Sequence, residues 1–400
     1  MMILEAIETY PEIYFENTEI AFSAKSDSDL EKAYWLFKMM SSPSLVKFGK
    51  YSTEFASAFY MPISWVIKPT IYKQFCGGES LNDCDKTLAQ LAKYGIKSIL
   101  DYSVEGKQSE TVFEATAKEI MATINKAARD RNNIPFAAFK VTGIARFNLL
   151  KKLSTKSSLD DAEKNEFENI KLRIKNICQA AYDNKIPVMI DAEESWVQDS
   201  IDDMVMSMME LFNKQWPCVY NTLQMYRWDR LAYLKQVYAD AERKNYILAV
   251  KLVRGAYMEK ERLMAKQKVD QSPIHENKTG SDKDFDLALK FCVQHIDKIA
   301  LFAGTHNERS SLYLTELIKQ YQIDKKNSRI WFSQLYGMSD HISYNLAKAG
   351  YNVVKYVPYG PVREVLPYLI RRAQENTSIA GQTGRELSLI LKEKQRRLRR

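Results

Sequence analysis

The chain has 400 residues, of which 46% are hydrophobic and 12% aromatic, and its formal net charge at pH 7 is +8. This composition is typical of a globular protein with a sizeable core, and the length suits one large domain or two modest ones. The positive excess is mild and partly lies in the terminal run "KEKQRRLRR". Such a run is more typical of a solvated helix end or a frayed tail than of a nucleic-acid interface, so we expect no nucleic-acid partner.

The five cysteines are odd in number, widely spaced and without a CxxC pair: Cys76, Cys84, Cys178, Cys218 and Cys292. This usage favours a reducing compartment and argues against a disulfide framework or a zinc ribbon. The first 24 residues contain no Lys or Arg, so no signal or transit peptide is expected. The apolar run Phe55–Ile67 is too short for a bilayer and contains Pro62. We therefore expect a cytoplasmic protein, with a peripheral contact to the inner face of the cell membrane left open.

The predicted secondary structure divides the chain into three regions. Residues 1–94 read as helices, for example "SDLEKAYWLFKMM" with a Ser/Asp cap and apolar residues at helical spacing. From residue 95 to about 380, short apolar strands alternate with long amphipathic stretches. Residues 381–400 read as a basic C-terminal helix or tail.

Eight strands are predicted within the middle region, each followed by a helical pattern. They span 98–104, 136–144, 188–194, 219–226, 247–257, 299–304, 329–337 and 352–360. Eight strand–helix units over this length predict an α/β fold of the (β/α)8 barrel type, and a doubly wound open sheet is the alternative.

The carboxyl ends of these strands are unusually polar. In a (β/α)8 barrel these ends meet at one rim, where the active site lies. A set of this kind at one rim indicates a site more than it indicates solvated strand ends. The set comprises Lys140, Thr142, Asp191, Glu193, Glu194, Gln224, Tyr226, Lys251, Arg254, Thr305, His306, Asn307, Gln334, Tyr356 and Tyr359.

Several common motifs are absent from the sequence. No two glycines form a G-x-G pair, which excludes a Rossmann fingerprint and a Walker loop, and the four histidines show no HExxH spacing. The carboxylates of "DAEE" (Asp191–Glu194) leave a metal-dependent barrel lyase or hydrolase open as an alternative. Because lysines and arginines crowd the other strand ends, we expect an anionic ligand and no metal.

The helix predicted over residues 362–376 places Arg371 and Arg372 one turn before Glu375. Guanidinium groups bind a carboxylate in a two-point fork, and a glutamate accepts hydrogen bonds from an ammonium group. One helix face therefore matches an amino-acid zwitterion. An intrahelical ion pair at the surface, which contributes about 0.3–0.5 kcal/mol, stays open as the alternative.

The stretch "YLIRRAQEN" resembles the signature helix of the proline dehydrogenase family. "IDAEES", "KLVRGAY", "AGTHN" and "FSQLYGM" resemble that family's other barrel blocks, in the same order, across residues 95 to 380. The resemblance implies a distorted (β/α)8 barrel that holds FAD without a Rossmann domain, with the last barrel helix over the active rim. It also implies oxidation of L-proline to Δ1-pyrroline-5-carboxylate by hydride transfer to flavin N5, the first step of proline catabolism to glutamate, with a membrane quinone as electron acceptor.

Carried over to this sequence, the resemblance implies roles for individual residues. Arg371, Arg372 and Lys140 would bind the proline carboxylate, Glu375 would face the ring nitrogen, and Leu335, Tyr356 and Tyr368 would enclose the ring. Asp191 and Lys251 would be the catalytic pair, with Asp191 anchoring positive groups and Lys251 donating to flavin N5. The implied FAD-binding residues are Ala192, Gln224, Lys251, Arg254, Gly255, Thr305, His306 and Asn307.

Two positions bear on chemistry and substrate choice. Many bacterial members have arginine where this chain has Lys251, and the two cations are not interchangeable. A tyrosine at position 356 favours proline, whereas relatives that act on hydroxyproline tend to have a smaller residue there, so a hydroxyproline dehydrogenase is the alternative within the family. The polar stretch 270–285, at the active rim, is either a mobile lid or an irregular loop.

Two expectations concern partners. Since the sequence shows no second large domain after residue 380, the product would pass to a separate pyrroline-5-carboxylate dehydrogenase. An alternative from another class is a binding module whose basic tail contacts a membrane or nucleic acid.

Overall fold

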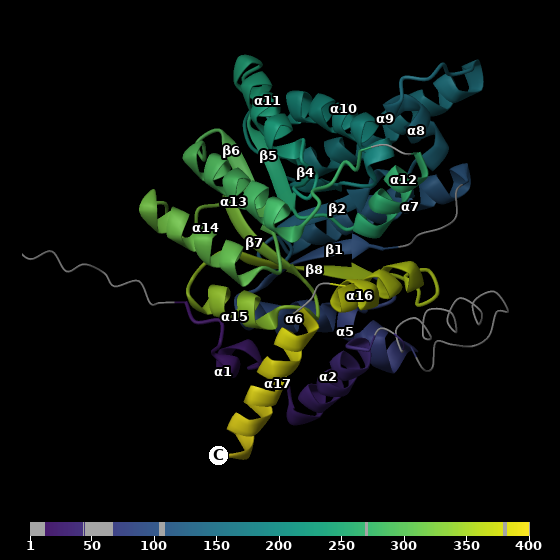
Figure 1. The fold of residues 1–400 in the computed structure, drawn as a ribbon. Helices are drawn as coiled ribbons and strands as arrows, with labels where there is room; N and C mark the ends of the chain where they lie inside the picture. Colours follow the sequence, from purple (N-terminus) through teal and green to yellow (C-terminus); the bar gives the residue numbers. More distant parts are fainter. Residues whose placement is uncertain are drawn as a thin grey trace, which may run out of the picture.

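Eight parallel strands close into a barrel in sequence order, from β1 to β8, with β1 paired to β8 (Figure 1). The computed structural model describes residues 13–42, 44, 67–103, 109–268, 271–378 and 382–399, without the side chains of residues 268, 374–378 and 382–383. The strands are β1 Lys97–Tyr102, β2 Phe136–Lys140, β3 Val188–Asp191, β4 Val219–Gln224, β5 Leu248–Val253, β6 Ile299–Gly304, β7 Ile330–Leu335 and β8 Val353–Tyr359. The predicted barrel is confirmed, and the open-sheet alternative is wrong.

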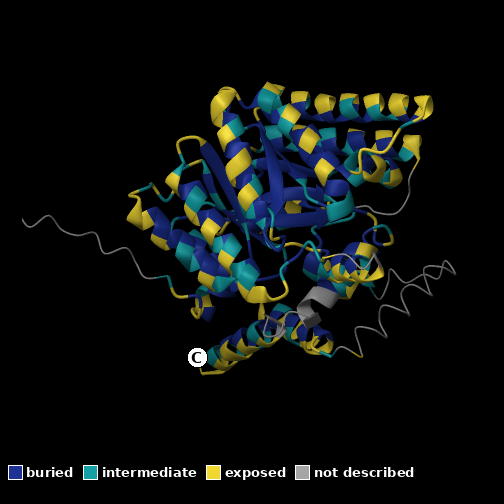
Figure 2. Ribbon diagram, turned by 45° about the horizontal axis from the view of Figure 1, so that its top comes forward, coloured by how far each residue is buried: buried dark blue, intermediate teal, exposed yellow. Residues whose placement is uncertain are grey.

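Helices between the strands cover the outside of the barrel, and Figure 2 shows buried strands inside a ring of helices with exposed outer faces. In chain order the helices of the barrel are α6 Asp85–Ala92, α7 Glu110–Arg129, η2 Val141–Gly143, α8 Phe147–Ser154, α9 Asp161–Asp183, α10 Ser195–Phe212, α11 Arg230–Arg243, α12 Met258–Lys268, α13 Lys278–Gln294, α14 Glu308–Gln320, α15 Asp340–Lys348 and α16 Leu366–Ser378. Before and after them come α1 Thr18–Ala21, α2 Asp27–Met40, η1 Lys68–Tyr72, α5 Lys73–Phe75 and, at the C-terminus, α17 Gln382–Leu398.

The strands alternate between two buried faces. Residues such as Leu100, Ile190 and Leu252 pack outward against the helices in the largest hydrophobic cluster. Residues such as Phe136 and Phe302 point inward and fill the barrel in a separate cluster. Since successive side chains of a strand point to opposite faces, the residue two positions beyond an inward residue also points inward.

Several predicted strands run too far at their carboxyl ends. The strand predicted over 136–144 ends at Lys140 and continues as the single turn η2, and the one predicted over 247–257 ends at Val253. At Thr142 the backbone N–H donates to the Glu193 carboxylate at 3.0 Å. A backbone group bound by a side chain cannot also join the sheet ladder, so the strand stops where the rim begins.

The N- and C-terminal segments pack together outside the barrel. Residues of α2, α5, α16 and α17 share one hydrophobic cluster, which includes Phe37, Phe75 and Leu389. Arg397 of α17 pairs with Asp27 at 2.7 Å, and Figure 1 shows α17 running beside α2. Of the two alternatives expected for the basic terminal run, a helix end or a frayed tail, the structure agrees with the helix, which runs to Leu398.

Two further expectations meet the structure only in part. The predicted loop 270–285 is helical from Lys278 onward, because Asn277 caps α13 by accepting from the N–H of Gly280 at 3.0 Å. The apolar run Phe55–Ile67 lies outside the described residues except for Ile67. Of the helices that the structure describes, none has both the length and the apolar character needed to cross a bilayer.

Candidate active site

Charged side chains gather inside the barrel where the strands end. Lys140 and Asp191 are register partners at the ends of β2 and β3. Each comes two residues after an inward-pointing residue, Ala138 or Met189, so each also points into the barrel. Lys251 lies opposite Thr222 in the β4–β5 ladder, and Tyr356 points inward from β8. We call Lys140, Asp191, Lys251 and Tyr356 the barrel-mouth cluster.

Asp191 is the centre of the barrel-mouth cluster. Its Oδ1 accepts from Lys251 Nζ at 2.5 Å and from the Tyr356 hydroxyl at 2.8 Å. The Lys251 ammonium also lies 4.6 Å from the centre of the Tyr356 ring. Burial raises the pKa of Asp191, but the nearby Lys251 and Lys140 outweigh burial and the net pKa is below its ordinary value. Asp191 is therefore an ionised anchor that fixes Lys251 and Tyr356.

The Tyr356 hydroxyl is held in its protonated form. Burial, followed by the charges of Asp191 and Asp101, raises the pKa of Tyr356 well above its ordinary value. The phenol therefore donates to Asp191, and its ring stays fixed across the mouth of the barrel.

Asp101, at the end of β1, is a rim carboxylate that the sequence reasoning missed. Its Oδ2 accepts from Ser103 at 2.6 Å and pairs with Lys140 Nζ at 3.5 Å. Its buried Oδ1 has no hydrogen-bond partner among the described residues. A buried carboxylate oxygen without a partner is costly and points to a ligand. Asp101 comes two residues after the inward-pointing Ile99, and this spacing could have indicated that it points into the barrel. From the sequence alone it is predicted only as part of the strand over 98–104.

Arg254 is held by three partners after β5. Its guanidinium donates to Asp282 at 2.7 Å, to Thr305 Oγ1 at 2.7 Å and to Ser310 Oγ at 2.8 Å. It also stacks 4.4 Å from the Phe285 ring centre. Residues of α13 and the first turn of α14 thus fix a cation beside the predicted cofactor residue Thr305. Asp282 and Ser310 were not predicted as site residues: Asp282 was placed only within the polar stretch 270–285, and Ser310 gave no sequence signal of facing the rim.

The main chain around Gly255, after β5, lies beside the side-chain amide of Gln224, at the end of β4. Gly255 has φ +136°, and a Cβ there would lie 2.4 Å from the Tyr226 ring, so only glycine is accommodated. Gln224 Nε2 donates to the Glu193 carbonyl at 2.7 Å, and its Oε1 accepts from the N–H of Ala256 at 3.3 Å. Ala192, in the loop after β3, is half-buried.

The segment Thr305–Asn307 follows β6 and begins α14. Asn307 caps that helix by accepting from the N–H of Ser310 at 3.0 Å. His306 Nδ1 and the Ser339 hydroxyl lie 2.9 Å apart. Burial, followed by the charges of Lys355 and Arg372, lowers the pKa of His306 to about 3. His306 is therefore a neutral imidazole whose second ring nitrogen can face a ligand.

Helix α16 brings Tyr368 and Arg372 to the rim, both buried, and Arg371, which is half-buried. The Arg372 guanidinium lies 5.2 Å from the Tyr368 ring centre, and its charge acts on His306 across the rim. The predicted helical spacing of Arg371, Arg372 and Glu375 is confirmed by the bounds of α16. The side chain of Glu375 lies outside the described part of the structure.

The carboxylates of "DAEE" point to different partners. Asp191 binds Lys251, Glu194 pairs with Lys260 at 2.6 Å, and Glu193 accepts from the Thr142 hydroxyl at 2.8 Å. Burial raises the pKa of Glu193 to about 7. Because three different cations and donors occupy these carboxylates, they do not form one ligand set, which weakens the metal-centre alternative.

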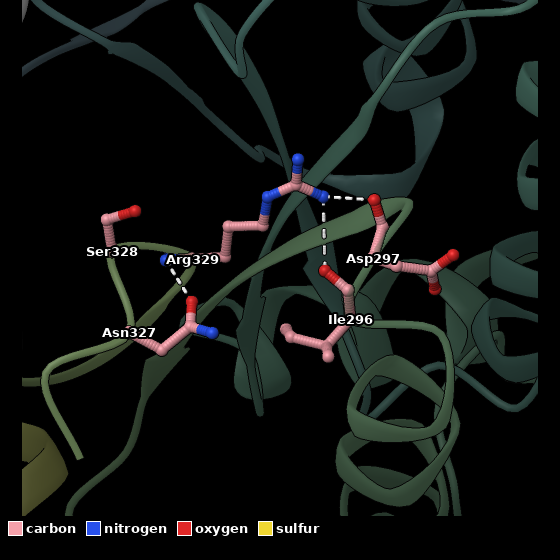
Figure 3. Close-up of a pocket in the computed structure, with 5 residues that line it drawn as sticks. All are labelled: Ile296, Asp297, Asn327, Ser328 and Arg329. Carbon is pink, nitrogen blue, oxygen red and sulfur yellow. Dashed lines mark hydrogen bonds between the residues drawn. The ribbon is translucent and has the colours of Figure 1, made fainter. Parts of the chain in front are cut away.

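A hollow of about 570 Å³ lies at the end of the barrel where the strands begin, opposite the barrel-mouth cluster (Figure 3). It is lined by Ile296, Asp297, Asn327, Ser328 and Arg329, which precede β6 and β7. Arg329 donates there to the carbonyls of Ile296, at 3.1 Å, and Asp297. These contacts tie together the loops that precede β6 and β7.

The sequence is similar to one protein family and to several known proteins. A family model described as "Proline dehydrogenase" matches residues 84–385. "Proline dehydrogenase 1, mitochondrial" from Dictyostelium discoideum is 33% identical, over 96% of this chain and 75% of that protein. "Hydroxyproline dehydrogenase" from Xenopus laevis is 30% identical, over 94% of this chain and 89% of that protein.

Solved structures share the fold. A crystal structure of proline utilization A from Bdellovibrio bacteriovorus, inactivated by N-propargylglycine, matches with a TM-score of 0.71 at 20% sequence identity. The match covers 90% of this chain and 38% of that one. At this identity the likeness concerns the fold alone.

Proposed function

Because the chain belongs to the proline dehydrogenase family, we propose that it oxidises L-proline to Δ1-pyrroline-5-carboxylate with FAD as its cofactor. The observation that carries the proposal is the group of charged side chains at the mouth of the barrel. Lys140 and Lys251 stand beside the carboxylates of Asp101, which is buried, and Asp191, which is half-buried, and α16 brings the buried Arg372 to the same rim. A small zwitterion is the ligand class that matches this charge pattern.

The residues after β4, β5 and β6 suit FAD. They supply an amide at Gln224, cations at Lys251 and Arg254, and a neutral imidazole at His306. A pyrophosphate and a polar ring edge require donors of this kind. The residues that would hold FAD are Ala192, Gln224, Lys251, Arg254, Gly255, Thr305, His306 and Asn307. When bound, FAD supplies the acceptor for the hydride.

The substrate residues act by binding and orientation. Arg371, Arg372 and Lys140 would hold the carboxylate of proline, because guanidinium and ammonium groups form charge-assisted hydrogen bonds with it. Glu375 would face the ring nitrogen, and Tyr368 and Leu335 would enclose the ring. Fixing the substrate in this way lowers the entropic cost of reaching the reactive geometry.

Asp191 and Lys251 act as a unit in this proposal. Asp191 keeps the Lys251 ammonium in place at 2.5 Å, and the cation stabilises negative charge that develops beside it. Asp191 also fixes the Tyr356 ring, through the hydroxyl at 2.8 Å.

A proton must leave the substrate as well, because proline reacts as the free amine. Asp101 Oδ1 is a buried acceptor that the described residues leave open near Lys140. It can accept a hydrogen bond from the ring nitrogen on the side away from the flavin-binding residues of β4–β6.

Hydroxyproline is the second candidate substrate, since a relative named for it is 30% identical over most of this chain. Tyr356 discriminates between the two. Its ring is buried and tied to Asp191, so it occupies room that a ring hydroxyl would need. We therefore propose proline as the preferred substrate.

The test is a steady-state comparison of L-proline with 4-hydroxyproline, using a soluble dye as electron acceptor. We expect higher kcat/KM for proline in the natural protein, and a shift of the ratio toward hydroxyproline in Tyr356→Ser. Equal activity on both substrates, unchanged by the substitution, would contradict the role given to Tyr356.

Partners beyond the substrate belong to the same proposal. A membrane quinone would take the electrons, reached by a peripheral contact with the bilayer, and a separate pyrroline-5-carboxylate dehydrogenase would take the product. The support is chemical: a quinone is lipid-soluble, and the family's product needs a further oxidation to give glutamate. Vesicles containing a quinone test the contact, because the chain should sediment with them and turn over without dye.

A further inference from the structure

The C-terminal helix α17 reaches the rim of the barrel with a buried carboxylate. Glu386 is only 3% exposed, and its Oε1 accepts the backbone N–H of Ser339 at 2.6 Å. Ser339 lies in the turn between β7 and α15, far from α17 in the sequence. A carboxylate buried against one backbone N–H has a positional task, since burying a charge without function is costly.

Ser339 has an unfavourable backbone conformation, with φ 50° and ψ 44°. For a residue with a side chain this left-handed region costs about 1–2 kcal/mol, so surrounding contacts must hold it there. Glu386 supplies one such contact. Lys355 of β8 supplies another, because its Nζ donates to the carbonyl of the preceding Met338 at 2.5 Å.

The side chain that this turn presents is the one that meets His306. Ser339 Oγ and His306 Nδ1 are 2.9 Å apart. A hydrogen bond at Nδ1 fixes the ring orientation and leaves Nε2 as the nitrogen that can face a ligand. The contacts thus run in one line from Glu386 through Ser339 to His306.

The neighbouring residue of α17 holds the other side of the same loop. Arg385 Nε and Nη2 donate to the Glu308 carboxylate at 2.7 and 3.1 Å. Glu308 follows the cap residue Asn307 directly, and His341 Nε2 lies 3.0 Å from the same carboxylate. Two adjacent residues of α17 therefore contact both loops that carry predicted FAD-binding groups or their supports.

We propose that α17 is part of the cofactor site: Glu386 is a positioning residue that orients His306 toward FAD through Ser339. The inference rests on the proposed function, because it takes His306 as an FAD contact. It goes beyond that function in giving the C-terminal helix, 80 residues after His306, a role in cofactor binding rather than in stability alone.

A second buried glutamate on the same helix provides a matched control. Glu393 is 0% exposed, but it accepts from Arg396 and Arg397 of α17 itself and lies two turns further from the rim. Glu393→Met removes a buried carboxylate from the same helix without touching the Ser339–His306 line. Any loss of helix docking should therefore appear in both Glu393→Met and Glu386→Met, and loss of positioning only in Glu386→Met.

The experiment measures FAD affinity of the full-length apoprotein by flavin fluorescence, together with the visible spectrum of the bound flavin and Tm. We expect Glu386→Met, which removes the acceptor of the Ser339 N–H, and Ser339→Ala each to weaken FAD binding by about five- to tenfold, the range for one buried hydrogen bond. The double variant should bind FAD no more weakly than the single variant with the lower affinity, since both substitutions break the same line of contacts. Glu393→Met should bind FAD within about twofold of the natural protein, even where its Tm falls.

The proposal is overturned if Glu386→Met behaves like Glu393→Met, with a lower Tm and unchanged FAD affinity and spectrum, or if the effects of Glu386→Met and Ser339→Ala multiply in full. Ser339→Ala keeps the test open where Glu386→Met does not fold. A natural protein that binds no FAD overturns the proposed function itself. A natural protein that binds FAD and is reduced by proline, with all variants alike, overturns only the role of α17.

Discussion

The two halves of the barrel interior are built from the same strands and differ completely in chemistry. In the half near the strand beginnings, Phe136 makes edge-on contacts with Tyr220, Phe302 and Trp331, at 5.8, 5.4 and 5.1 Å between ring centres. Four residues further along the same strand, beyond Ala138, lies Lys140, and across the mouth lie Asp191 and Lys251.

We infer from this difference that the aromatic half serves stability and that the charged half serves a ligand. Aromatic packing contributes favourable burial, whereas buried charges must recover a desolvation cost of several kcal/mol per ion. A barrel selected for stability alone would continue the apolar filling to the rim. The barrel-mouth cluster is therefore best explained by a ligand, and substitutions should separate activity from stability along the barrel axis.

The largest expected effect is at Arg372. Replacing it by Met keeps the length of the side chain and would remove the two charge-assisted hydrogen bonds that we propose Arg372 makes to the substrate carboxylate, about 2 kcal/mol each. We expect kcat/KM for L-proline to fall on the order of a thousandfold. Steady-state assays on the FAD-loaded protein measure this, and a fall of less than tenfold would remove Arg372 from the substrate site.

The next effect is on stability and concerns Glu193. Burial raises the pKa of Glu193 from 4.5 to about 7, so between these values the folded protein binds more protons than the unfolded chain. The stabilisation is complete below about pH 4.5 and is lost as pH rises through about 7. Glu193→Gln should remove this dependence, which amounts to roughly 3 kcal/mol between the two limits.

Urea denaturation at pH 5 and pH 8 measures the change in the free energy of unfolding. Glu194→Gln, at the neighbouring buried carboxylate paired with Lys260, is the control and should keep the natural difference between the two pH values. An unaltered difference in Glu193→Gln would show that Glu193 is ionised in the folded state.

Asp191→Asn should have a smaller effect on catalysis than the loss of Arg372. The amide still accepts a hydrogen bond from Lys251 or Tyr356, but the charge that anchors the ammonium is gone, a loss of about 2 kcal/mol. We expect kcat/KM to fall about thirtyfold, with the FAD content retained. Kinetic assays and absorbance report both, and unchanged kcat/KM would mean that Asp191 serves only the fold.

The smallest effect is expected at the other end of the barrel. Arg329→Met removes the bonds to the carbonyls of Ile296 and Asp297, which solvent can partly replace, so the free energy of unfolding should fall by about 1 kcal/mol. Proline oxidation should stay at the natural rate. A clear loss of activity would break the separation between the two ends and would assign a functional role to the hollow of Figure 3.

The sequence predicted the barrel because its signals are local: short apolar strands and long amphipathic helical stretches alternate eight times. It also predicted the polar rim, because strand ends are the places where apolar runs stop. The predicted strands extend too far beyond Lys140 and Val253. The strand that ends at Lys140 stops where the N–H of Thr142 donates to the Glu193 carboxylate, a contact that the local sequence does not reveal.

Long-range contacts account for what the sequence missed. Asp101 reads as an ordinary strand residue until its neighbours in β2 and β8 are known. Glu386 reads as one charge in a basic helix, and only the docking of α17 brings it to Ser339. The roles of Arg371, Arg372 and Glu375 at the substrate stay predictions.

The most direct test of the account is the visible absorbance of the purified full-length chain when L-proline is added without oxygen. The account predicts that the chain binds FAD and that its flavin absorbance bleaches with L-proline, much less with hydroxyproline, and not in Arg372→Met. A chain that takes up no FAD on reconstitution, or whose bound flavin stays oxidised in the presence of proline, would contradict it.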